Sequence, residues 1–204
     1  MITTFRIPAA AALLALTAAC AQEPAPPPAV TQGEWRVISE ASKLSYVSIK
    51  AGEIAEVNEF EGLTGSVSGD GAAQIDIALG SVSTGVDIRD ERMREIFFEV
   101  AQNPTATISA QLDPATFTSL DVGESVSQTI SGTLALKGIE APVEAEVTAT
   151  RTGPDRVLVV SDRPVILYAA TWQLTEGLAK LQQLAGLPSI TPAVPVSFSI
   201  TFAR

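Results

Sequence analysis

Few residues of this chain are of a type that carries out chemistry. The 204 residues contain no histidine, and Cys20 is the single cysteine. This composition excludes a Ser-His-Asp triad, a histidine-ligated haem and the common histidine-containing zinc sites. The nearest approach to an acidic cluster is formed by Asp70, Asp87, Asp90 and Glu91, whose spacing matches no calcium-loop signature. We interpret these carboxylates as solvated charge, and we expect a protein that is not an enzyme and holds no metal and no cofactor.

Cys20 follows a segment with the features of an export signal. Met1 to Ala19 carries a single basic residue ahead of an apolar run that is too short to span a bilayer. The stretch Leu16-Thr17-Ala18-Ala19-Cys20 resembles the lipobox of bacterial lipoproteins, in which the cysteine is lipidated. Thr17 departs from that pattern, which usually has leucine there. We predict a signal peptide at residues 1–19 and a lipidated Cys20 that begins a proline-rich linker over residues 20–34. The alternative is an ordinary signal peptide with an incidental cysteine.

The charge of the chain limits the partners that it can have. It carries 13 basic and 23 acidic residues, a formal net charge of −10. An acidic domain of this size repels nucleic acid and anionic lipid surfaces. We therefore expect no nucleic-acid binding, and a membrane link only through the lipid on Cys20, in the periplasm. Residues 35–204 are enough for one well-buried domain.

Most of this domain shows the alternation of apolar and polar residues that is typical of half-buried strands. The clearest run is at 194–202, where every second residue is valine, isoleucine or phenylalanine. Similar runs occupy residues 44–46, 75–79, 130–136 and 143–149, and tight-turn residues separate them. This pattern predicts an antiparallel barrel or sandwich. Two segments with helical spacing, 89–101 and 175–185, predict short amphipathic helices inserted into the sheet.

Two neighbouring segments resemble the central signature of the YceI family. The first is Ser81-Val82-Ser83-Thr84 followed by the Arg89-Asp90 pair, and the second is Phe97-Phe98-Glu99 leading into an Asn103-Pro104 turn. Further similarities lie upstream, at Phe60, Leu63, Gly65 and Val67, and downstream, in Gly132-Thr133-Leu134-Ala135-Leu136-Lys137-Gly138-Ile139 with Pro142-Val143. The order and spacing of these motifs cover the chain from about Trp35 to the C-terminus.

The chain also departs from the pattern of that family. Histidines that are frequent in the family are replaced by Arg92 and Lys137. The segment around Tyr168 and Trp172 replaces the usual Arg-Ser-Asp-Phe-Gly-like stretch. A chemical role of those histidines would not be shared here, and the mouth of a barrel could be reshaped near Trp172.

The resemblance implies an all-β fold, an antiparallel eight-stranded lipocalin-like β-barrel with one or two short inserted helices, whose interior holds an isoprenoid chain such as a polyprenyl quinone or polyprenyl phosphate. We expect the ligand to be lined by large apolar side chains, although packing in a plain core is the alternative for each of them. These candidates are Tyr46, Phe60, Phe97, Phe98, Trp172, Leu178, Leu181 and Phe198.

Arg89 has two interpretations. Its guanidinium could lie near a polar head group at the mouth of the barrel. Alternatively, an ion pair with Asp90 and a helix cap would hold the loop, and this interpretation is preferred.

Three functions follow as hypotheses. The first is a carrier or reservoir for an isoprenoid lipid. The second is a structural or partner-binding lipoprotein whose barrel is filled by its own side chains, and the third is an enzyme that acts on a lipid through acidic residues alone. A homodimer stays open as a further form of association.

Overall fold

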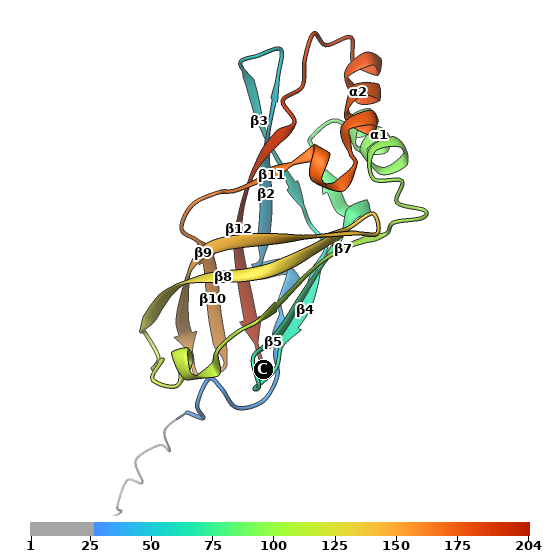
Figure 1. The fold of residues 1–204 in the computed structure, drawn as a ribbon. Coiled ribbons are helices and arrows are strands. Elements are labelled where there is room, and N and C mark those ends of the chain that lie inside the picture. The colour runs from blue at the N-terminus through green and yellow to red at the C-terminus, as the bar shows by residue number, and fades with distance from the viewer. Residues whose placement is uncertain (1–26) are drawn as a thin grey trace, which may run out of the picture.

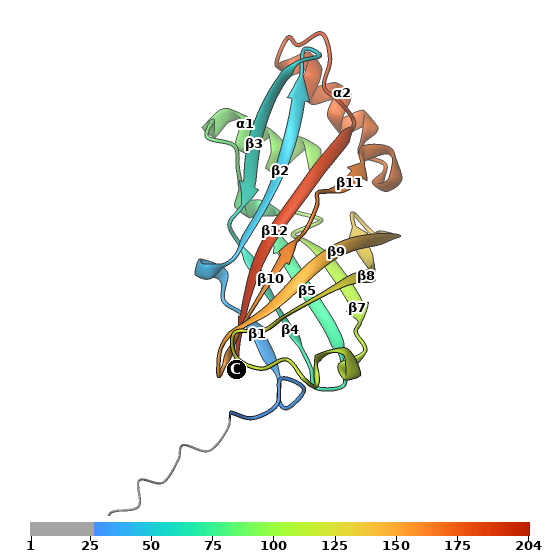
Figure 2. The same cartoon turned by 90° about the vertical axis from the view of Figure 1, so that its left-hand side faces the viewer.

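A ring of eight antiparallel strands forms the wall of a barrel (Figures 1 and 2). The computed structural model describes residues 27–204. The ring runs in the order β1-β4-β5-β7-β8-β9-β10-β12, and β12 pairs with β1 to close it. These strands are β1 (Trp35–Val37), β4 (Leu63–Val67), β5 (Ala72–Ala78), β7 (Thr105–Gln111), β8 (Ser125–Leu136), β9 (Ile139–Gly153), β10 (Arg156–Ser161) and β12 (Ala193–Ala203). The predicted eight-stranded antiparallel barrel is confirmed.

The alternating runs of the sequence form the longest strands of this wall. β8 pairs over its whole length with residues 139–150 of β9 in a hairpin. The two-residue turn between them has a positive φ at both positions, 50° at Lys137 and 74° at Gly138. Such turns match the right-handed twist of the flanking strands. Hydroxyl pairs such as Ser127 with Thr148, 2.8 Å apart, lie on the outer face, so the apolar set of each strand faces inward.

Four further strands extend the barrel beyond the ring. The N-terminal half of β12 pairs with β2 on one edge and with β11 on the other. β3 then pairs with β2 and β6 with β3. These strands are β2 (Lys43–Lys50), β3 (Ile54–Phe60), β6 (Val82–Ser83) and β11 (Val165–Tyr168).

Short helices gather at this extended end, which we call the helical end (Figure 1, top). They are α1 (Asp87–Arg92), the π-helix η3 (Met93–Phe97), the 3₁₀ turns η2 (Leu79–Ser81) and η5 (Ala169–Trp172), and α2 (Thr175–Leu184). Two more 3₁₀ turns, η1 (Ser39–Ala41) and η4 (Pro114–Phe117), lie in other connections.

The first predicted helix is shorter than expected and changes its pitch. The predicted span of 89–101 is wrong at both ends, because the helix begins at Asp87 and ends before Phe98. The amide of Phe98 donates to the carbonyl of Met93, five residues earlier, over 2.9 Å. This π-turn places Met93 and Phe98 together on the buried side, and a left-handed φ of 50° at Glu99 ends the helix. The second predicted helix, 175–185, is confirmed as α2 to within one residue.

The opposite end of the barrel, which we call the closed end, is packed with apolar side chains and holds the start of the described chain. A second apolar cluster lies here around Trp35, Val157, Ile200 and Phe202. The guanidinium of Arg151, only 2% exposed, donates to the carbonyls of Leu120, Pro28 and Pro154.

The last part of the predicted proline-rich linker is attached to the barrel. Arg204 donates to the carbonyls of Pro28, Ala29 and Gln32 and stacks over the Trp35 ring at 4.6 Å. Residues 28–32, expected to belong to a spacer over 20–34, thus lie against the closed end. Cys20 and the predicted signal peptide lie outside the described residues.

One glycine is required by the wall itself. Gly65 in β4 has a φ of +144°, and a Cβ atom there would lie 2.2 Å from the carbonyl oxygen of Gln74 on β5. The glycine of the family-like motif therefore allows two strands to approach closely. Between residues 27 and 204, no helix has the length and apolar character needed to cross a bilayer.

Candidate functional site

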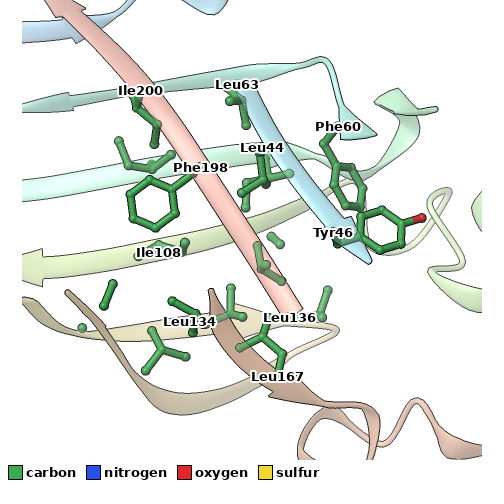
Figure 3. A pocket seen from close by; sticks show the side chains of 18 of the residues that line it. Leu44, Tyr46, Phe60, Leu63, Ile108, Leu134, Leu136, Leu167, Phe198 and Ile200 are labelled. Carbon is green, nitrogen blue, oxygen red and sulfur yellow. The ribbon is translucent and has the colours of Figure 1, made fainter. Parts of the chain in front are cut away.

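The barrel encloses a cavity of about 310 Å³ between its closed end and its helical end (Figure 3). Side chains from the inner faces of the strands form its wall, which is almost wholly apolar. All five alternating runs of the sequence contribute residues to it, among them Leu44, Ile77, Leu134, Val143 and Ile200. The pattern that predicted the strands thus also defines the lining of the cavity.

The cavity exists because small residues lie side by side on three neighbouring strands. Ala73 of β5 is opposite Ala110 of β7, which is opposite Gly132 of β8. All three line the cavity. Large residues occupy the neighbouring inward positions, for example Ile75 and Ile108. A barrel of eight strands is just wide enough for side chains to fill it, so a row of small residues leaves space for a ligand.

Six of the eight apolar candidates named from the sequence line this cavity. Four of them form a chain of aromatic contacts at the helical end, in which the ring centroids are 5.6 Å apart for Tyr46–Phe60, 5.8 Å for Phe60–Phe98 and 4.8 Å for Phe98–Phe97. Trp172 and Phe198 lie on other parts of the wall. Leu178 and Leu181 of α2 pack against the buried cluster from outside and do not line the cavity.

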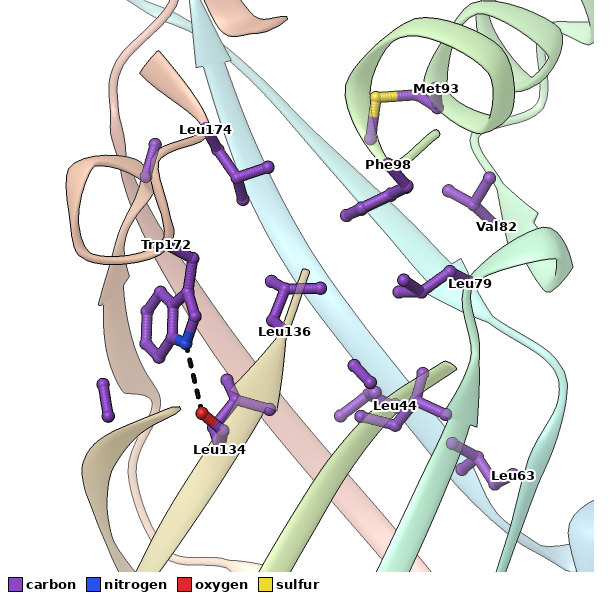
Figure 4. Close-up of a cluster of buried hydrophobic side chains, with 14 residues drawn as sticks. Leu44, Leu63, Leu79, Val82, Met93, Phe98, Leu134, Leu136, Trp172 and Leu174 are labelled. Atoms are coloured by element: carbon purple, nitrogen blue, oxygen red, sulfur yellow. Dashed lines mark hydrogen bonds between the residues drawn. The ribbon is translucent and has the colours of Figure 1, made fainter. Parts of the chain in front are cut away.

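Trp172 is fixed in the wall by a hydrogen bond (Figure 4). Its indole Nε1 donates to the carbonyl oxygen of Leu134 on β8 over 3.1 Å, and the side chain is only 4% exposed. A buried indole needs such a partner for its N–H. Leu79, Met93 and Phe98 belong to the same buried cluster and connect the cavity wall to the helices.

Arg89 is the centre of a polar network at the helical end. Its Nε donates to the hydroxyl of Thr84 over 2.8 Å, and its Nη2 donates to the carbonyl of the same residue over 2.6 Å. Its Nη1 pairs with Glu56 of β3 at 2.5 Å. Asp90 instead accepts from the amide and the hydroxyl of Thr84. The expected Arg89–Asp90 ion pair is therefore wrong. The guanidinium of Arg89 pairs with Glu56, which lies far away in the sequence, and Asp90 is hydrogen-bonded to Thr84 instead.

Two pKa values near the cavity are shifted, one by burial and one by this network. Burial raises the pKa of the Tyr46 hydroxyl above its ordinary value, although the positive charge of Arg89 opposes this shift. The hydrogen bond from Lys50, assisted by Arg89, lowers the pKa of the Glu56 carboxyl. Tyr46 thus stays a neutral hydroxyl and Glu56 a charged carboxylate at physiological pH.

Several residues of the wall were missed when the site was predicted. Leu63, Leu79, Leu136 and Leu167 line the cavity but were not named as candidates. The alternation itself could have identified Leu136, because it already placed that residue on an inward face. No signal in the sequence marked Leu167, since β11 is too short to show a period. Within the described part of the chain, no group of three or more acidic or cysteine side chains could hold a metal ion.

Comparisons with known proteins identify a matching family and similar solved structures. The sequence profile of the YceI-like domain matches residues 35–202. A polyisoprenoid binding domain from Saccharophagus degradans, implicated in plant cell wall breakdown, has 34% sequence identity and a TM-score of 0.81 over 83% of this chain and 98% of that chain. BcnA from Burkholderia cenocepacia shares the fold, with 15% identity and a TM-score of 0.58 over 81% of this chain and 98% of that chain. A search of curated proteins found no match.

Three findings agree with one another: the motifs in the sequence, the closed barrel, and the profile match over most of the chain. The protein belongs to the YceI-like domain family.

Proposed function

We propose that this protein binds the chain of an isoprenoid lipid in its barrel cavity and carries or stores that lipid. The observation that carries the proposal is the apolar cavity of about 310 Å³, with the similar polyisoprenoid binding domain as support. Each methylene group moved from water into such a cavity contributes roughly 0.8 kcal/mol. Binding of this kind needs no catalytic residue.

The head group of the lipid lies at the helical end in this proposal, beside Tyr46 and Arg89. An uncharged quinone suits this place better than a phosphate. Arg89 and Lys50 already share the carboxylate of Glu56, so a phosphate would have to compete with an existing ion pair. A quinone carbonyl can accept a hydrogen bond from the Tyr46 hydroxyl and leave those pairs intact.

Extraction of the native protein tests the proposal. Protein purified from its own host without detergent is extracted with organic solvent, and the extract is analysed by mass spectrometry. We expect a polyprenyl quinone in a defined ratio to the protein. Repeated absence of any polyprenyl lipid would overturn the proposal, and a polyprenyl phosphate in its place would overturn the head-group assignment alone.

The proposal includes a periplasmic location and a lipid anchor on Cys20. Its support is the sequence of residues 1–20, which has the order of an export signal followed by a lipobox-like segment. A fatty-acid probe fed to the cells should label the protein, and the Cys20→Ser variant should stay unlabelled. Equal labelling of both, or of neither, would count against the anchor.

The two competing hypotheses have less support. A barrel filled by its own side chains does not fit a cavity of this size. An enzyme that works through paired carboxylates needs two of them facing each other, whereas Glu144 is the one acidic residue among those that line this cavity.

A further inference from the structure

The wall of the barrel is interrupted between β9 and β11. β9 pairs with β10 only from Val147 onward, so its segment 139–146 pairs with β8 on one edge alone. β11 pairs with β12 on one edge and with no strand of residues 27–204 on the other. The two unpaired edges face the same break in the wall, above the end of β10 (Figure 2).

A groove of about 480 Å³ occupies this break. It is lined by residues 142–144 of β9, by residues 165–168 of β11, and by Thr171 and Trp172 of η5. Six of these residues also line the barrel cavity, including Val143, Leu167 and Trp172. A single layer of side chains therefore lies between the groove and the cavity. Ile166 and Tyr168 leave 47% and 56% of their surface exposed beside it.

The barrel cavity is too small for a long isoprenoid chain. A cavity of about 150 Å³ accommodates one benzene molecule, with six carbons. On that scale the 310 Å³ of the main cavity hold about twelve carbons, or about two isoprene units. The smaller cavity beside Trp35, of about 90 Å³, adds about four carbons on the same scale, so the two cavities together hold about three isoprene units. The packed cluster at the closed end prevents further passage.

We propose that the groove between β9 and β11 is a lateral opening, through which the distal part of a long isoprenoid chain leaves the barrel and lies along Val143, Ile166 and Leu167. This inference rests on the proposed function. The chain enters the groove because the unpaired edges of β9 and β11 leave the wall without its ladder of hydrogen bonds there. The apolar sides of the groove then shield part of the tail from water.

Two alcohols that differ only in chain length test the opening. Farnesol has three isoprene units and solanesol has nine, and both are offered to the purified protein from phosphatidylcholine vesicles. The variant Ile166→Trp/Thr171→Trp narrows the groove with two indoles. The matched control is Ile54→Trp/Thr64→Trp, which makes the same changes at exposed positions that line no cavity.

We expect the groove variant to bind farnesol like the wild type and to bind solanesol at least about tenfold more weakly, while the control binds both normally. Retained farnesol binding also proves that the variant is folded. Unchanged solanesol binding overturns the inference, and so does an equal loss of both ligands, because the proposed effect depends on chain length. If the wild type binds farnesol but not solanesol, the lateral opening is wrong and lipid binding stands. If it binds neither, the proposed function fails as well.

A second measurement locates the tail directly. A solanesol analogue with a diazirine at its distal end should label residues 142–144 or 165–168 of the wild-type protein on irradiation. Labelling confined to the helical end would overturn the opening.

Discussion

The substitution Ala110→Phe tests whether the barrel cavity is a binding site. Ala110 lies in the row of small residues that creates the cavity. The substitution adds one phenyl ring, which needs about 150 Å³, or about half of the space. The ring takes the place of about six carbons, slightly more than one isoprene unit. At roughly 0.8 kcal/mol per methylene group, binding should weaken by about 5 kcal/mol, or roughly 3,000-fold in Kd.

The same substitution should not destabilise the free protein. In a filled core an added ring forces strain and costs about 1–3 kcal/mol. In an empty cavity the ring instead gains apolar contacts, so the free energy of unfolding stays equal or rises. A loss of affinity together with unchanged or greater stability is therefore the signature of a cavity that holds the ligand.

Both quantities can be measured on the same samples. Trp172 lines the cavity, so its fluorescence emission should follow a farnesol titration, and urea unfolding gives the stability. Ala55→Phe is the control, since Ala55 is exposed on β3 and lines no cavity. If Ala110→Phe loses stability and keeps its Kd for farnesol, the assignment of the cavity as the binding site is refuted.

Three further substitutions test other parts of the structure. Gly65→Ala should lower the free energy of unfolding in urea by about 3 kcal/mol or more because its Cβ meets backbone, whereas Gly85→Ala, at a φ of +72° in open space, should cost only about 1–2 kcal/mol; equal losses would contradict the close-approach argument. The pKa of Glu56 is lowered by folding, so its contribution is present above its ordinary value of 4.5 and is lost as the pH falls below that. The protection factors of the α1 amides, which correct for the intrinsic effect of pH on exchange, should therefore fall in acid in the wild type, and Glu56→Gln should abolish that dependence; an unaltered acid response in the variant would count against the network. Arg151→Met should cost about 2–4 kcal/mol, because three carbonyl oxygens lose their donor, and limited proteolysis should then remove residues before the barrel. Arg163→Met, at a side chain 70% exposed, is its control, and similar digestion of both variants would speak against the role of Arg151.

Much of the fold could be predicted because the wall of a barrel has a strict period of two. The run at 194–202 placed five residues on one face, and all five line the cavity. Contacts that depend on distant parts of the chain could not be read in this way. Glu56 and Arg89 lie on separate elements, and only the folded sheet brings them together. The preferred partner from the sequence was Asp90, which is adjacent in the chain but is held by Thr84.

The first helix shows why local spacing can mislead. Met93, Ile96, Phe97 and Val100 have the spacing of a regular helix. The structure inserts a π-turn, so the buried residues are Met93 and Phe98. Packing of Phe98 against Phe60 and Phe97 favours the π-turn. The spacing of apolar residues within the segment does not predict this packing.

The attachment of residues 28–32 to the closed end decides how the barrel can stand on a bilayer. If Cys20 carries the anchor, seven residues, Ala21 to Pro27, separate it from the attached segment, and a chain of that length reaches at most about 25 Å. β12 alone, with 11 residues, extends about 36 Å from the closed end toward the helices. An upright barrel would therefore hold its helical end far from the lipid, and contact of that end with the bilayer requires the barrel to tip onto its side. The length of the linker, as much as the anchor itself, would thus determine which side of the barrel faces the membrane.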